Sequence, residues 1–305
     1  MTFRKTFTTA ASVLGLLSFS ACAYSAPVET AAAPVEVTSQ GPAIWSVSDA
    51  DTTIYLFGTV HALPEGVDWY KGPISQALES ADTLVTEIPT DAASDPAAQQ
   101  AIAMRAMLPA DASLRTSLGT EKAAKYEAAL TKLGLPVNAF DRFEPWFAGM
   151  TLAVLPLMQS GWTADSGVEK VVETNAGAQT KRDALETVEY QIGVFDNLPE
   201  KAQVDFLMST VDSLDELVPM MDKMLAEWVE GDADGLADLM NQSLTDPVLA
   251  KALLYDRNAK WADWIDARMA TPGTVFIAVG AGHLAGEKSV QDYLKKHRLA
   301  VTRVQ

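Results

Sequence analysis

Two of the three histidines in this chain lie in the same local sequence frame. His61 ends the run Thr53-Ile-Tyr-Leu-Phe-Gly-Thr-Val-His61, and His283 ends the run Val275-Phe-Ile-Ala-Val-Gly-Ala-Gly-His283. Each run is an apolar, strand-like segment followed by a glycine, two small or branched residues and a histidine. Because α/β folds place their chemistry where a strand gives way to a loop, the two Gly-x-x-His motifs predict an α/β fold with a site at two strand ends.

The motifs belong to a longer repeat, in which each is followed by a helix and a second strand. The helix and strand are predicted over residues 74–80 and 83–87 in the first unit, and over 289–296 and 300–304 in the second. The first unit ends in Glu87, and the second has Arg303 at the matching position. The repeat predicts that His61 and His283 approach each other in one cleft. Glu87 is expected on a strand beside the one that carries His61.

These residue types are suited to binding a metal ion. Two imidazoles and a carboxylate, with open coordination positions, are typical of catalytic zinc and iron sites. We therefore expect His61, His283 and Glu87 to hold a divalent ion, with manganese, cobalt and zinc as candidates. Glu87 is either a ligand or the general base. The alternative is that both histidines are hydrogen-bonded structural residues and that Glu87 is a surface carboxylate.

Arg257 and Asn258 are polar residues in an otherwise apolar helical segment. One interpretation places them in the cleft, where a guanidinium group and an amide bind a carboxylate or a carbonyl group of a substrate. The other places them on an exposed helix face. The first interpretation makes Arg257 and Asn258, together with Glu87, the candidate catalytic residues.

The first 25 residues have the three-part pattern of a secretory signal peptide: a basic start, a short apolar stretch and small residues. Cleavage is expected after Ser25. The alternative is cleavage before Cys22, in which case a lipid on this residue anchors the protein to a membrane. The sequence thus predicts a signal peptide (1–25), a flexible Ala/Pro-rich linker (26–42) and one domain (43–305), in a periplasmic or secreted protein.

The middle of the domain is predicted to be a large helical insertion, from about residue 95 to residue 270. Helices are expected over residues 96–107, 120–133, 145–158, 167–173, 188–195, 199–214, 219–229 and 247–269. Strand-like segments are expected on both sides of this insertion, so the fold class is mixed α/β.

Composition narrows the range of partners. Cys22 is the only cysteine, which excludes disulfides, cysteine metal sites and cysteine nucleophiles from the mature domain. The formal net charge of −17 disfavours nucleic acid, since such a chain repels phosphate groups. A peptide or a saccharide is the expected partner, and the sequence does not specify an oligomeric state.

The ordered set of motifs resembles the TraB/PrgY/GumN family, and within it the GumN-like bacterial branch. The resemblance covers about residues 44–304. Its motifs are Ile44-Trp45 with Val47-Ser48, Tyr55-Leu-Phe-Gly-Thr-Val-His-Ala-Leu-Pro64, Glu87, Leu185-Glu186-Thr187 with Gln191, Asp256-Arg257-Asn258 and Val279-Gly-Ala-Gly-His-Leu-Ala-Gly286.

The resemblance implies an erythromycin-esterase/ChaN-like core and a divalent metal held by the two Gly-x-x-His motifs and the glutamate. The family also resembles the Tiki membrane metalloproteases. In many members an acidic residue follows the glutamate, whereas Ile88 and Pro89 follow Glu87 here, so that position supplies no fourth ligand. The expected function is an exported metal-dependent hydrolase that acts on peptide bonds. The alternative is a non-catalytic periplasmic protein that sequesters a peptide or an exopolysaccharide-linked saccharide.

Overall fold

The computed structural model describes residues 41–92, 95–243 and 246–305. All of these residues belong to one compact unit. The predicted signal peptide, both cleavage alternatives and nearly all of the linker lie outside the described residues.

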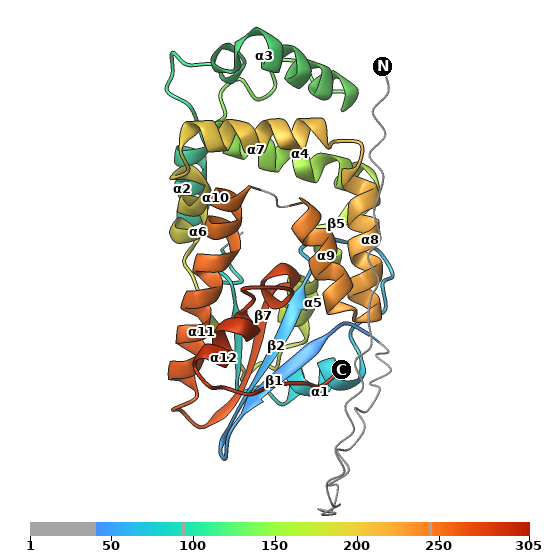
Figure 1. The fold of residues 1–305 in the computed structure, drawn as a ribbon, viewed down its shortest axis with the longest axis vertical. Coiled ribbons are helices and arrows are strands. Elements are labelled where there is room, and N and C mark those ends of the chain that lie inside the picture. Colours follow the sequence, from blue (N-terminus) through green and yellow to red (C-terminus); the bar gives the residue numbers. More distant parts are fainter. Residues whose placement is uncertain (1–40, 93–94, 244–245) are drawn as a thin grey trace, which may run out of the picture. The chain divides into compact units, whose positions relative to one another are not determined.

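The centre of the fold is a six-stranded mixed sheet with the strand order β6-β4-β7-β2-β1-β8. Figure 1 labels β7, β2 and β1 of this sheet in the lower half of the view. Its strands, in chain order, are β1 (Ile44–Ser48), β2 (Thr52–Thr59), β4 (Thr83–Thr86), β6 (Lys181–Ala184), β7 (Gly273–Gly280) and β8 (Val301–Arg303). The four strands from β6 to β2 are parallel, and β1 is antiparallel to both of its neighbours. The strands β1 and β2 form an antiparallel hairpin at the start of the domain. The fold class, mixed α/β, is confirmed.

Both predicted repeat units are present as secondary structure. The first is β2, α1 (Gly72–Glu79) and β4, and the second is β7, α12 (Val290–Lys296) and β8. One detail of the prediction is wrong: β4, the strand that leads to Glu87, lies beside β7 and not beside β2. The physical reason is that the crossover through α1 skips one position in the sheet, and β7 fills that position with parallel pairing on both sides.

Most of the remaining chain is helical, as predicted. The helices between the two units are α2 (Pro96–Ala106), α3 (Leu114–Lys132), α4 (Pro145–Gln159), α5 (Val168–Asn175), α6 (Val188–Asp196), α7 (Glu200–Asp212), α8 (Leu217–Glu230), α9 (Ala233–Ser243), α10 (Pro247–Ala250) and α11 (Asp256–Arg268). A π-helical turn over Lys251–Tyr255 joins the last two. The sequence did not predict α9, nor the edge strand β6, which lies within the predicted insertion. A short two-stranded sheet of β3 (Leu63–Pro64) and β5 (Trp162–Thr163) was not predicted either.

Apolar residues cover both faces of the sheet. Alternate residues of β7 point to opposite faces: Phe276 and Ala278 lie in one core cluster, and Val275 and Ile277 lie in the other. The first cluster includes side chains of α1, α5 and α8, and the second includes side chains of α11 and α12. Because β7 is buried on both faces, its sequence is a continuous apolar run. This layered arrangement fixes the position of the strand ends that carry the predicted site.

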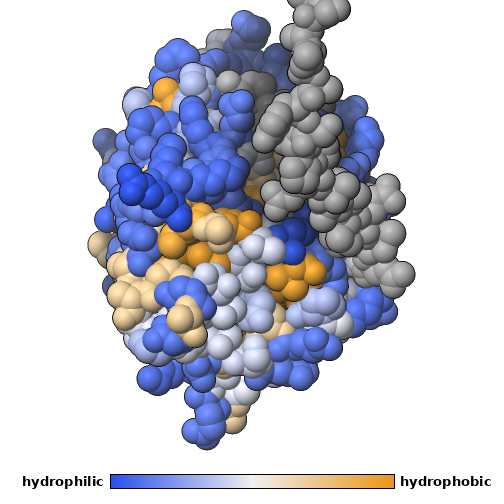
Figure 2. Space-filling model, turned by 60° about the horizontal axis from the view of Figure 1, so that its bottom comes forward, coloured by the Kyte–Doolittle hydropathy of each residue, from blue (hydrophilic) through white to orange (hydrophobic). Residues whose placement is uncertain are grey.

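The face shown in Figure 2 is mostly hydrophilic, with hydrophobic residues gathered near its middle. Within residues 41–92, 95–243 and 246–305, no helix is both long enough and apolar enough to cross a membrane.

Candidate functional site

The predicted site residues follow three neighbouring parallel strands at their carboxyl ends. In the sheet order β4-β7-β2, Glu87 comes directly after β4 and His61 shortly after β2. His283 lies in the 3₁₀ turn Ala281–Leu284 that follows β7. The carboxyl edge of parallel strands is where open α/β sheets bind their ligands. The topology therefore delivers all three side chains to one edge of the sheet.

Glu87 is buried and fully hydrogen-bonded. Its Oε1 accepts a hydrogen bond from the backbone N–H of Gly280 at 2.8 Å, and its Oε2 accepts from Gln191 Nε2 at 2.8 Å and Arg257 Nη2 at 2.7 Å. Burial alone would raise the pKa of this carboxyl group. Its interactions with His283, Arg257 and His61 and the hydrogen bond from the Gly280 N–H outweigh burial and lower the pKa to about 2. Glu87 is therefore an ionised carboxylate at neutral pH.

Arg257 lies between two buried carboxylates. Its Nε and Nη2 donate to Oε1 and Oε2 of Glu186, each at 2.8 Å, while Nη2 also reaches Glu87. The side chains of Arg257 and Glu186 are 8% and 5% exposed, so this ion pair is largely withdrawn from water. Trp261 Nε1 donates to Glu186 Oε1 at 2.9 Å, and the guanidinium group lies 4.8 Å from the Trp261 ring. The alternative of an exposed helix face for Arg257 and Asn258 is wrong, because the first turn of α11 packs against the sheet end and buries both residues.

His283 is held in one orientation by three side chains. Asn258 Nδ2 donates to the carbonyl oxygen of Lys288 at 2.8 Å, which leaves Asn258 Oδ1 to accept from His283 Nδ1 at 2.5 Å. His283 Nε2 then carries the lone pair and accepts from Arg257 Nη1 at 3.2 Å. The ring also packs on Trp261, with a centroid distance of 4.3 Å. Burial lowers the pKa of His283 to about 3, so its imidazole is neutral.

His61 is in a different environment, since 75% of its side chain is exposed. Its Nδ1 lies 2.6 Å from Glu169 Oε1, and the hydroxyl group of Thr59 donates to the same oxygen at 2.5 Å. The hydrogen bond and the charge of Glu169 raise the pKa of His61 to about 9. Because the ring is exposed, water screens this pair, and the pair adds little to the stability of the fold.

The start of α5 is docked closely onto the first Gly-x-x-His motif. Val168 donates its backbone N–H to the carbonyl oxygen of Val60 at 3.0 Å. A Cβ atom built on Gly167 would lie 2.1 Å from the carbonyl oxygen of His61. Glycine is therefore required at position 167 by this close backbone approach and not by an unusual φ angle.

Replacing Gly167 by alanine is expected to lower the free energy of unfolding by about 1–3 kcal/mol, because the methyl group has no room beside the His61 carbonyl. Urea unfolding of the two proteins measures the difference. Gly193→Ala in α6 is the matched control, since its Cβ atom would first meet the flexible amide of Asn197 at 3.1 Å. Equal stabilities of the two variants would contradict the expectation.

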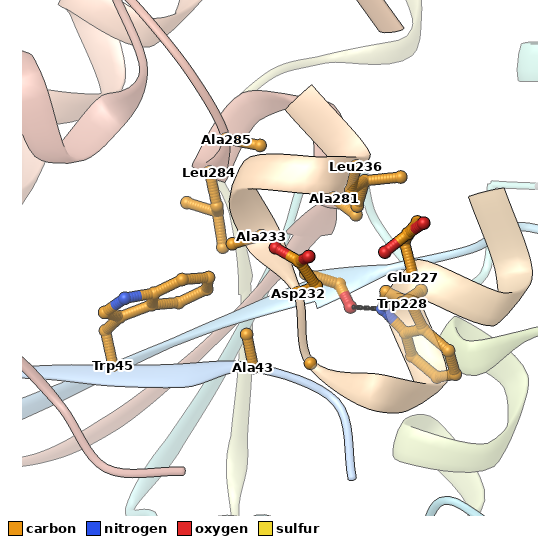
Figure 3. A pocket seen from close by; sticks show the side chains of 12 residues that line it. Ala43, Trp45, Glu227, Trp228, Asp232, Ala233, Leu236, Ala281, Leu284 and Ala285 are labelled. Atoms are coloured by element: carbon orange, nitrogen blue, oxygen red, sulfur yellow. Dashed lines mark hydrogen bonds between the residues drawn. The ribbon is translucent and has the colours of Figure 1, made fainter. Parts of the chain in front are cut away.

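Figure 3 shows a second anchor of the first motif. The indole N–H of Trp228, on α8, donates to the carbonyl oxygen of Gly58 at 2.8 Å. A Cβ atom on Gly58 would lie 3.0 Å from Cα of Ala281, so the first glycine of this motif lets the second motif come close. The narrow cavity around these residues is lined mainly by small and apolar side chains.

A larger cavity, of about 330 Å³, opens beside Glu87. His61, Glu169 and Gln191 line it together with Glu87, and apolar wall residues are Ile88, Pro89, Ala92 and Ala164. The structure thus places Glu87, Arg257, Asn258 and His283 in one hydrogen-bonded cluster. His61 shares the cavity with Glu87 and bonds to Glu169.

The donors suit a divalent ion in type and in ring orientation. Metal-binding histidines usually donate one ring N–H to an oxygen of a second residue, which fixes the other nitrogen as the ligand. Both His61 and His283 use Nδ1 in this way, toward Glu169 and Asn258 respectively, so Nε2 is the nitrogen of each ring that could bind an ion. In the part of the chain that the structure describes, however, no three His, Cys, Asp or Glu side chains are gathered closely enough to hold an ion together. Arg257 occupies one oxygen of Glu87 and Nε2 of His283.

Three residues with defined contacts in the site had no role assigned from the sequence. Glu186 and Gln191 belonged to the motif set that carried the family resemblance, but nothing in their spacing indicated that they would bind Arg257 and Glu87. No sequence pattern indicated Glu169, since it is one of many acidic residues in the helical region. Only the docking of α5 on the first motif identifies it.

A mixed α/β fold with a polar, buried site at the carboxyl ends of its parallel strands defines the class of this protein. The sequence matches the TraB/PrgY/gumN family over residues 43–303, and the chain belongs to that family. The resemblance found from the motifs is thereby confirmed.

Among curated proteins, the chain is similar to "Uncharacterized protein YbaP" of Escherichia coli (strain K12), with 24% identity over 259 residues that cover 83% of this chain and 92% of that protein. It is also similar to an "Uncharacterized protein" of Treponema pallidum (strain Nichols), with 21% identity over 305 residues that cover 94% of this chain and 90% of that protein. No solved structure matches the chain significantly.

Proposed function

We propose that this protein is an exported, metal-dependent hydrolase that acts on peptide bonds. His61 and His283 hold a divalent ion, manganese, cobalt or zinc, through Nε2, and Glu87 holds it through its carboxylate. The observation that carries this proposal is the delivery of these three side chains to one sheet edge by the neighbouring strands β4, β7 and β2. We also propose that the core of the fold is of the erythromycin-esterase/ChaN-like type.

A bound ion would neutralise the charge of Glu87, and Arg257 would then be able to release Glu87 and His283. Its two hydrogen bonds to Glu186 would keep the guanidinium group at the site. There its N–H groups would bind a carbonyl or carboxylate group of the substrate. When bound, the ion supplies positive charge that polarises the scissile carbonyl group.

Asn258 contributes by positioning His283. Both polar atoms of its side-chain amide are already engaged, by His283 and by the carbonyl oxygen of Lys288, and the residue is 1% exposed. The cavity beside Glu87 has an apolar wall and several polar groups, as small-molecule and peptide sites commonly do. We propose that a peptide segment of the substrate occupies this cavity, and that nucleic acid is not a partner.

One observation favours a second candidate, a non-catalytic protein that sequesters a peptide or a saccharide. Glu87, Arg257 and His283 already satisfy one another in a closed network of hydrogen bonds. A network of this kind stabilises a binding cleft without any ion.

Metal binding separates the two candidates. Calorimetric titration of the purified protein with Mn²⁺, Co²⁺ and Zn²⁺ is expected to show one site. The His61→Ala and His283→Ala variants are expected to lose more than about 100-fold in affinity, since even the loss of an outer partner of a metal ligand costs about 10–100-fold. His297→Ala is the control, because this histidine lies at the end of α12 beside Asp263 and Asp266. Hydrolysis of a peptide library is then compared with and without the ion. No ion uptake, no turnover and retained peptide or saccharide binding would favour the sequestering protein.

A further inference from the structure

We propose that Glu169 is the positioning residue of His61: its carboxylate holds the imidazole through Nδ1 and thereby directs Nε2 to the cavity beside Glu87. This inference goes beyond the metal ligands of the proposed function, and its role in catalysis rests on that function. Glu169 and His61 come from segments 108 residues apart in the sequence.

The contacts of Glu169 are short and specific. A single oxygen, Oε1, lies 2.6 Å from His61 Nδ1 and accepts the Thr59 hydroxyl group at 2.5 Å. The Glu169 side chain is 31% exposed and lines the same cavity as His61 and Glu87. Because the Thr59 hydroxyl group occupies Oε1 from a second direction, the carboxylate cannot rotate without breaking both hydrogen bonds.

The backbone of α5 fixes Glu169 with respect to the motif. Gly167 approaches the His61 carbonyl group so closely that a Cβ atom has no room, and Val168 donates to the Val60 carbonyl oxygen. These contacts place three consecutive residues, 167–169, against residues 59–61, which are the last residue of β2 and the first two of the loop that follows it. This docking brings the Glu169 carboxylate within hydrogen-bond distance of the His61 ring.

His61 needs such a partner more than His283 does. His283 is buried and packed against Trp261, whereas the His61 ring is mostly exposed. Among the described residues, Glu169 is the one side chain that hydrogen-bonds the His61 ring. Without it, nothing selects one ring orientation or one tautomer, and Nε2 points to the cavity only part of the time. The carboxylate also makes the imidazole a stronger ligand or base.

The first test observes the His61 ring directly and does not depend on metal. Proton–nitrogen NMR of the histidine side chains is expected to show, besides any signal of the buried His283 N–H, a far-downfield Nδ1–H signal that disappears in His61→Asn. Glu169→Ala is expected to lose this signal, and Glu169→Gln is expected to keep a less shifted one, because the amide oxygen still accepts. Glu173→Gln is the matched control: Glu173 lies one turn further along α5, lines the same cavity and pairs with Arg182. Retention of the signal in Glu169→Ala would overturn the proposal.

The second test measures ion affinity in the same variants, with thermal unfolding to confirm that each is folded. Glu169→Ala is expected to bind the preferred ion about 10–100-fold more weakly, and Glu173→Gln within about twofold of the unchanged protein. If Glu169→Ala and Glu173→Gln lost the same ion affinity, Glu169 would contribute only negative charge to the cavity. That result would contradict a positioning role. If the unchanged protein binds no ion, the proposed function fails, and the NMR signal alone decides whether Glu169 positions His61.

Discussion

Replacing Arg257 by methionine is expected to lower the free energy of unfolding by about 3–5 kcal/mol. The substitution leaves the carboxylates of Glu87 and Glu186, whose side chains are 11% and 5% exposed, buried without their shared counter-ion. Removing one partner of a buried charge network costs more than the network itself contributes, because the remaining charges cannot return to water. Urea unfolding at neutral pH measures the loss.

Arg105→Met is the matched control for this substitution. Arg105 pairs with Asp196 at 2.9 Å, but the two side chains are 41% and 26% exposed. An exposed pair of this kind contributes about 0–1 kcal/mol. If Arg257→Met lost no more stability than Arg105→Met, the buried cluster around Arg257 would not be a charged network.

Stability is expected to fall as the pH is lowered from neutral. The pKa of Glu87 is about 2 in the folded protein, against 4.5 for an unperturbed glutamate side chain. A carboxyl group with a lowered folded pKa stabilises the fold fully above the unfolded pKa and loses this contribution as the pH falls toward the folded pKa. The loss is about 1.4 kcal/mol for each pH unit between these values, or about 3 kcal/mol in total. His283 acts in the same direction and begins earlier, since burial lowers its pKa from 6.5 to about 3.

Unfolding free energies from urea titrations at pH 7, 5, 4 and 3 provide the measurement. The Glu87→Gln variant is less stable throughout, because Arg257 loses a partner, but it is expected to lose less stability between pH 4.5 and pH 3. Parallel pH profiles for the unchanged protein and Glu87→Gln would show that Glu87 is not the group responsible.

His61 affects stability in the opposite direction. Its pKa is raised, so its small contribution to stability is present in acid and disappears as the pH rises through about 9.

The sequence was most informative where the chain is locally regular. Apolar runs and glycines located β2 and β7, and the proline at position 145 together with the apolar run after it located α4. The broken start of α3 also agrees with the prediction, because Gly119, with a φ of +71°, interrupts the helix just before the expected start at Thr120. In each case the signal lies within about 15 residues of the feature that it predicts.

Features that depend on distant segments were not predicted. The place of β7 between β2 and β4 follows from how the two repeat units pack, and no local pattern encodes it. For the same reason the sequence placed Glu87 beside the wrong strand. Glu169 became a candidate only when α5 was seen to dock on the loop of His61. The burial of Arg257 likewise depends on Glu186, which lies 71 residues away in the sequence.

The position of β7 in the sheet has a consequence for how this protein folds. Residues 273–280 form a central strand, which pairs with one strand from residues 52–59 and another from residues 83–86. During synthesis, β2 and β4 therefore cannot pair with β7 until nearly the whole chain has been made. Until then each of these two strands has an unpaired edge. Such non-local pairing makes folding slow. We therefore expect the site at this sheet edge to form late in folding, since a chain cut short before residue 273 lacks the central strand.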